Sequence, residues 1–153
     1  MTNGTAAAET KLVWPSLAGF YATWSEIAYA LMRVIMGYIL FMHGWVKLGA
    51  GASGVAGYMA KIGLEPASIF AYAAMFLETA GAVCIIIGLF TRFFAAALAI
   101  EMAIALLVVH LAKGFSAAQG GYEYVLLLGI VLFVIALRGG GRYSVDRLLG
   151  KEL

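Results

Sequence analysis

An apolar stretch, MRVIMGYILFMHGWVKL at residues 32–48, constrains the fold most because it places charged groups inside a helix that must be buried. Arg33 lies near its start, and His43 and Lys47 lie near its end. A charge within a membrane helix costs a few kcal/mol unless it meets a partner or water inside a bundle. The rest of the chain must therefore supply partners for these residues.

The composition places this bundle in a membrane. Hydrophobic residues make up 64% of the 153 residues, and the chain has only 10 basic and 8 acidic side chains, too few to cover a soluble globule. A formal net charge of +2 is too small to indicate a nucleic-acid partner. We predict an all-α membrane protein with a lipid bilayer around it, built as one four-transmembrane-helix bundle over residues 1–153.

Apolar runs and helix breakers predict the order of segments. Apolar and aromatic residues repeat along one helix face before the first span, which predicts an N-terminal interfacial helix. The same spacing recurs after Ser53 and predicts a short outer amphipathic helix between spans 1 and 2. The predicted segments are an interfacial helix at 12–25, spans at about 26–47, 67–90, 92–112 and 122–138, and a basic tail at 139–153.

Basic residues predict the orientation of the four spans. Six lie on the side of the termini and three on the opposite side. By the positive-inside rule, the N- and C-termini are cytoplasmic and the end of the first span that carries His43 and Lys47 faces outward. Cys84 is the single cysteine, which excludes an intrachain disulfide or a CxxC redox pair, so any redox role needs a cofactor.

Four polar residues fall near the outer ends of the predicted spans: His43, Lys47, His110 and Glu123. We predict that His43, Lys47 and His110 bind a cofactor and that Glu123 transfers protons. Hydration or a hydrogen bond to a loop carbonyl is the simpler interpretation of the histidines. Two histidines can also be axial haem ligands, which we disfavour, and no local motif supports a metal site.

Three ionisable residues lie deeper in the predicted spans: Arg33, Glu78 and Glu101. Arg33 and Glu78 count to similar depth, so we predict that they form a buried ion pair. This pair either fixes the register of the helices or continues a catalytic proton route inward from Glu123. Glu101 either adds a second carboxylate to Arg33, stays protonated, or faces a neighbouring subunit, and helical counting places it on the face opposite His110.

The order of several short motifs resembles the DoxX family of small four-span bacterial membrane proteins. The matching features are Arg33 with Gly37, HGWVKL at 43–48, ETAG at 78–81 followed by Gly88, Thr91 and Arg92, His110 with KGF at 113–115, Tyr122 with Glu123, and the tail from Gly139 to Asp146. The resemblance implies a four-helix bundle in the bacterial inner membrane. It also implies a likeness to the DoxD subunit of thiosulfate:quinone oxidoreductase, whereas the family has no single established activity.

These observations favour a membrane subunit of a redox complex that binds a quinone or a similar apolar ligand near the outer face. The alternative is an accessory subunit, without catalysis, that assembles or anchors a larger complex or a homo-oligomer. A small-molecule carrier is the third hypothesis, and the sequence offers no inverted repeat or broken helix to support it.

Overall fold

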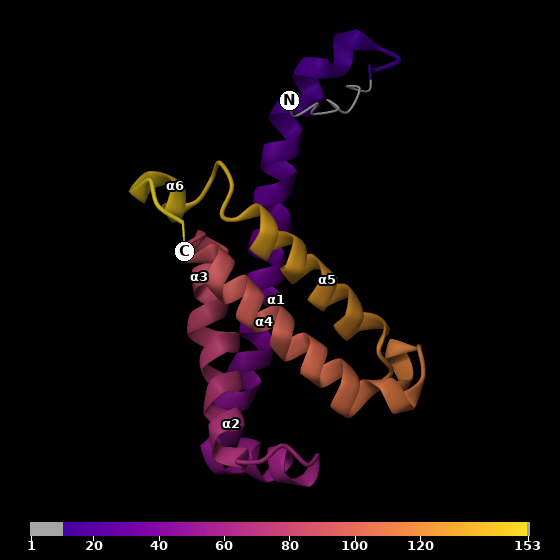
Figure 1. The fold of residues 1–153 in the computed structure, drawn as a ribbon, viewed down its shortest axis with the longest axis vertical. Helices are drawn as coiled ribbons and strands as arrows, with labels where there is room; N and C mark the ends of the chain where they lie inside the picture. Colours follow the sequence, from indigo (N-terminus) through magenta and orange to yellow (C-terminus); the bar gives the residue numbers. More distant parts are fainter. Residues whose placement is uncertain (1–10, 153) are drawn as a thin grey trace, which may run out of the picture.

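The computed structural model describes residues 11–152, and within that range all regular secondary structure is helical, with no strand (Figure 1). The ends of the predicted single domain, residues 1–10 and 153, lie outside the described residues. The helical elements are η1 Pro15–Leu17, α1 Ala18–Lys61, α2 Ala67–Phe76, η2 Leu77–Gly81, α3 Ala82–Ile87, α4 Thr91–Ala105, η3 Leu106–His110, η4 Leu111–Lys113, η5 Ala117–Gln119, α5 Glu123–Arg138 and α6 Val145–Leu149.

Three helical stretches are long and apolar enough to cross a membrane: Pro15–Lys61, Ala67–Ile87 and Thr91–Lys113. The prediction of a helical membrane protein is therefore confirmed. The fourth predicted span corresponds to α5, which has 16 residues. At about 1.5 Å per residue, α5 is roughly 24 Å long and falls short of a hydrocarbon core about 30 Å thick.

Helix α1 is longer than predicted because no break separates the interfacial stripe from the first span. Ser25, the expected boundary, lies inside the helix, and its hydroxyl donates to the carbonyl of Ala22 at 3.3 Å. The side chains of Phe20, Tyr21 and Trp24 are half exposed on these first turns. In Figure 1 this part of α1 extends past the other helices.

Gly51 bends α1 near its far end. Its φ of 73° and ψ of 159° are non-helical, and glycine adopts them without a steric penalty. Beyond this kink the helix continues to Lys61 and buries Val55 and Met59 in a small cluster with α2. The kink thus folds the segment after residue 51 against α2.

Two glycines let α1 approach the backbone of η2 and α3, which run antiparallel to it. A Cβ on Gly37 would lie 2.7 Å from Cγ1 of Ile86 and 2.8 Å from the carbonyl oxygen of Ala82. A Cβ on Gly44 would overlap the backbone carbonyl of Glu78. Glycines at such positions permit the close helix contact on which membrane bundles depend.

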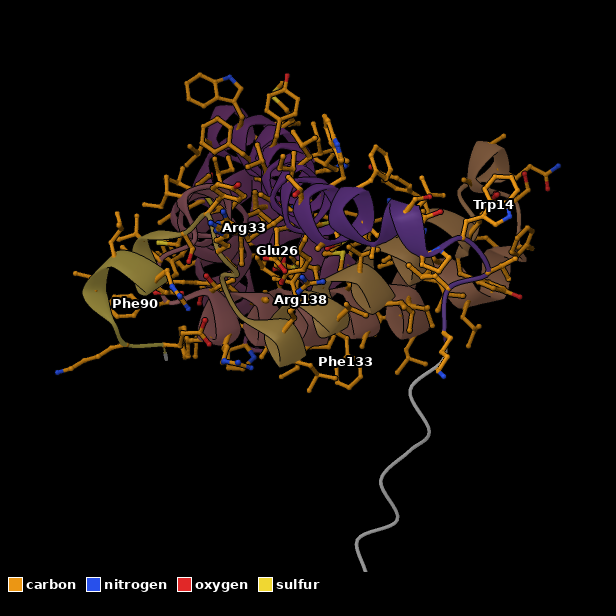
Figure 2. All side chains as sticks on the ribbon, turned by 90° about the horizontal axis from the view of Figure 1, so that it is seen from above. Trp14, Glu26, Arg33, Phe90, Phe133 and Arg138 are labelled. Carbon is orange, nitrogen blue, oxygen red and sulfur yellow. The ribbon has the colours of Figure 1, made fainter. Side chains whose placement is uncertain are left out.

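Helices α4 and α5 form a second antiparallel pair that runs side by side in Figure 1. Ala95 and Leu98 of α4 and Leu132 and Ile135 of α5 are fully buried in the main apolar cluster, which also includes residues of α1 and α3. Side chains on the outer faces remain exposed, including Phe133 in Figure 2, as expected for helices surrounded by lipid.

The C-terminal tail is not the surface segment that its composition predicts. Asp146 is 1% exposed, and its carboxylate accepts hydrogen bonds from the backbone N–H groups of Phe90 and Thr91 at 2.7 and 2.9 Å and from the Thr91 hydroxyl at 2.7 Å. The Asp146 N–H donates to the carbonyl of Gly88 at 2.9 Å. The tail therefore caps the first turn of α4 and fixes the connection between α3 and α4.

We predict that Gly37→Ala lowers the free energy of unfolding by about 1–3 kcal/mol, because the added methyl group must displace Ile86 or separate the two helices. The control is Gly49→Ala on the same helix, where no atom lies within 4 Å of the new Cβ. Unfolding by sodium dodecyl sulfate, followed by circular dichroism, measures both variants. Equal stability of the two variants would contradict the proposed close packing.

Candidate functional site

An ion pair between α1 and η2 lies at the centre of the candidate site. Lys47 Nζ donates to Oε2 of Glu78, and these side chains are 27% and 5% exposed. Glu78 takes this partner in place of Arg33, so the predicted Arg33–Glu78 pair is wrong. In a membrane helix a carboxylate this well buried requires such a counter-charge.

The backbone around Glu78 is a π-helix, Leu77–Gly81, inserted between α2 and α3. A π-helix has i→i+5 hydrogen bonds and a wider turn, and such insertions occur frequently at functional sites. Thr79 follows Glu78, and its hydroxyl donates to the carbonyl of Met75 within the same helix at 2.5 Å. Gly44 of α1 packs directly on the backbone of Glu78, which keeps Lys47, one turn further along, within reach of the carboxylate.

Glu101 of α4 brings a second carboxyl group to the ion pair. It lies within electrostatic range of both Glu78 and Lys47, and its Oε2 is buried with no hydrogen-bond partner in the described chain. Of the three roles predicted for Glu101, pairing with Arg33 is wrong, because Arg33 binds elsewhere. Two carboxyl groups thus lie near one ammonium group inside the bundle, and only Glu78 pairs with it.

A second π-helix, η3, changes where His110 lies. Helical counting predicts that Glu101 and His110 occupy opposite faces, yet both line the same cavity. A turn of π-helix contains more residues than a turn of α-helix. Because η3 lies between Glu101 and His110, it rotates His110 back toward Glu101. His110 Nδ1 lies 2.7 Å from the carbonyl oxygen of Gly120, which can only accept a hydrogen bond.

The cavity has a volume of about 490 Å³ and lies between α1, the α2–η2 segment and the α4–α5 pair. Its ammonium, carboxyl and imidazole groups come from His43, Lys47, Glu78, Glu101 and His110. The remaining walls are mainly apolar, with side chains from each of these helices. A volume of a few hundred Å³ with a few convergent polar groups is typical of sites for small apolar ligands.

Arg33 belongs to a different site at the other end of α1. Its Nη1 donates to the carbonyls of Ile85 and Ile86 at 2.7 and 3.2 Å, and its Nη2 donates to the carbonyl of Tyr143 at 2.6 Å. These carbonyls belong to the end of α3 and to the tail, where no helical N–H is available. Gly88, with a φ of 73°, leaves the space that the guanidinium occupies.

Glu123 does not line the cavity. It is exposed at the start of α5, and its Oε2 accepts a hydrogen bond from the N–H of Ala117 at 3.1 Å, so it holds the preceding loop. Within residues 11–152 no three histidine, cysteine or carboxylate side chains are grouped as metal ligands. Of the six predicted site residues, the fold brings together His43, Lys47, Glu78 and His110 and places Arg33 and Glu123 elsewhere.

Buried charges in an apolar bundle define the class of this molecule as a helical membrane protein with an internal polar site. A family model described as DoxX matches residues 28–111. A Bacillus subtilis protein named "Putative oxidoreductase CatD" is 32% identical over 126 residues, which cover 82% of this chain and 90% of that protein. An uncharacterized protein of Haemophilus influenzae is 31% identical over 127 residues, which cover 80% and 91%.

The chain belongs to the DoxX family, and the resemblance noted in the sequence is confirmed. No solved structure matches the chain. The geometry of the cavity therefore has to be interpreted from this chain alone.

We predict that Lys47→Met lowers the free energy of unfolding by about 3 kcal/mol, because it leaves the buried Glu78 carboxylate without its partner. This value is near the lower end of the loss expected for a buried ion pair, since Lys47 is 27% exposed. The double variant Lys47→Met with Glu78→Gln removes both charges and should lose less than the sum of the two single variants. Detergent unfolding titrations measure all three. Additive losses would show that Lys47 and Glu78 do not interact.

Proposed function

We propose that this DoxX-family protein is a membrane subunit of a redox complex and binds a quinone or a similar apolar ligand in the cavity. The observation that carries the proposal is a cavity of about 490 Å³ whose mainly apolar walls converge on an ammonium, two carboxyl groups and two imidazoles. The Bacillus subtilis relative, whose name is "Putative oxidoreductase CatD", supports the same class of activity.

The residues of the cavity fit the chemistry of a quinone. Its ring and tail need apolar contacts, which the walls provide, and its two carbonyl oxygens need hydrogen-bond donors. The Lys47 ammonium is a donor, and a neutral histidine donates from one ring nitrogen. Because the Gly120 carbonyl accepts from Nδ1 of His110, Nε2 of His110 is left as an acceptor for a hydroxyl of the reduced ligand.

Reduction of a quinone to a quinol takes two electrons and two protons. Glu78 and Glu101 beside Lys47 form a group that can hold and release a proton, which suits a proton donor at the ligand. The chain has a single cysteine and hence no dithiol of its own. The electrons must therefore come from a redox group on a partner subunit, and this chain supplies binding and protons.

We also propose a membrane topology for the chain. We place α5 as a fourth, short crossing, with both termini in the cytoplasm of a bacterial cell and the protein in the inner membrane. The six-to-three distribution of basic residues supports this orientation, and pairing of α5 along α4 supports the crossing. The cavity then opens nearer the outer side of the membrane.

An accessory role in assembly is the second candidate function. The observation that favours it is the first part of α1, which extends past the bundle and exposes Phe20, Tyr21 and Trp24 (Figure 1). Half-exposed aromatic side chains on a protruding helix suit either the membrane interface or a partner subunit. A protein that only assembles a complex has no need of ligand binding in the cavity.

We predict that Ala105→Phe weakens binding of decylubiquinone at least about tenfold, because the phenyl group fills space in the cavity that Ala105 lines. The matched control is Ala103→Phe on the same helix, whose side chain is exposed and outside the cavity lining. Quenching of tryptophan fluorescence in nanodiscs gives the affinity. No quinone binding by the wild type, or equal loss in both variants, would contradict the proposed site and favour an assembly role.

A further inference from the structure

A second, shallower pocket lies at the opposite end of α1 from Lys47. It has a volume of about 460 Å³ and is formed by the start of α1, the end of α5 and the tail. Its lining residues are Glu26, Arg138, Gly141, Arg142, Arg147 and Glu152. Lys47 follows Glu26 by 21 positions in α1, which separates the two sites by roughly 30 Å along the helix, so the second pocket is independent of the proposed ligand cavity.

Both carboxylates of this pocket already have partners. Glu26 Oε1 accepts from Arg138 Nη2 at 2.8 Å, and Figure 2 shows these two residues together. Glu152 Oε2 accepts from Nε of Arg92 at 2.7 Å. The Arg138 guanidinium also lies 4.0 Å from the centre of the Tyr29 ring.

Arg142 and Arg147 are left as the excess positive charge of the pocket. Both are exposed, and within residues 11–152 neither forms a salt bridge. The two carboxylates of the pocket are bound to Arg138 and Arg92, so the guanidinium groups of Arg142 and Arg147 remain to attract an anion. Arginine donors are suited to a phosphate group because several N–H groups of one side chain can bind its oxygens.

The backbone that carries the two arginines is fixed by buried contacts. Arg33 binds the carbonyl of Tyr143 next to Arg142, and the Ser144 hydroxyl accepts from the N–H of Arg147 at 3.2 Å. Asp146, beside Arg147, is held at the start of α4. A preorganised backbone lowers the entropy lost when an anion binds.

Apolar side chains next to the arginines indicate which anion binds. Tyr143 is 51% exposed, Leu148 is 85% exposed and Leu149 is 59% exposed. A free phosphate ion has no apolar group that could pack on this surface, whereas a phospholipid carries acyl chains beside its phosphate. Segments that combine arginines with exposed leucines bind anionic lipid through both charge and apolar burial.

We propose that Arg142 and Arg147 bind the phosphate of an anionic phospholipid, such as phosphatidylglycerol, and that α6 lies in the headgroup region of the membrane. The lipid thereby holds the tail, and through Arg33 and Asp146 the ends of α3 and α4, against the bilayer. The site lies on the side that carries most of the basic residues of the chain.

The test measures binding of phosphatidylglycerol to detergent-purified full-length protein by native mass spectrometry. The double variant Arg142→Gln with Arg147→Gln should bind it roughly 30-fold more weakly, because each arginine contributes about 1 kcal/mol and about 1.4 kcal/mol corresponds to a tenfold change in affinity. The matched control, Lys61→Gln with Lys113→Gln, removes the same charge from exposed sites outside the pocket and should bind as the wild type does.

The remaining arms separate the possible outcomes. Phosphatidylcholine should bind weakly to all variants, and inorganic phosphate at millimolar concentration should not displace phosphatidylglycerol. The double lysine variant Arg142→Lys with Arg147→Lys should keep most of the binding, which excludes misfolding as the cause of the loss. Equal binding by the glutamine variant and its control, or complete displacement by inorganic phosphate, would overturn the proposal.

Discussion

The ion pair between Lys47 and Glu78 is the interaction on which the rest of the structure depends. A carboxylate that is 5% exposed within membrane-crossing helices needs a cation, and Lys47 is held beside it because Gly44 lets α1 lie on the backbone of η2. The π-helical turn at Glu78 aims the carboxylate into the bundle, where Glu101 joins it. The cavity lies around this charged group, which supplies its ammonium and carboxyl groups.

The other end of the same helix pair is held by a different chemistry. There Arg33 satisfies carbonyl groups at the end of α3 and in the tail, and Asp146 satisfies N–H groups at the start of α4. Backbone groups at helix ends are costly to bury without partners, so two charged side chains stabilise the connection between the spans. The contacts of Arg33 thus hold helix ends and the tail together, whereas Lys47 lines the cavity.

The sequence was sufficient for the helical membrane class and the family, and it singled out His43, Lys47, Glu78 and His110, which line one cavity. The sequence did not predict the partners of Arg33 and Glu78, because the depth of a residue in the membrane can be counted only from approximate span ends. In an antiparallel pair the register is set by contacts, and Gly44 opposite Glu78 places Arg33 near Ile86 instead. The two π-helices leave no clear pattern in the sequence, so the sequence does not show that Glu101 and His110 line the same cavity.

The central claim is that a quinone-like ligand occupies the cavity beside Lys47, Glu78 and Glu101. Photolabelling of the protein in native membranes with an azido-quinone, followed by peptide mass mapping, tests it most directly. The account predicts labels on peptides from α1 around His43 and from α4 around Glu101, with protection by excess unlabelled quinone. Labels confined to exposed outer faces of the helices, or labels that excess quinone does not prevent, would contradict it.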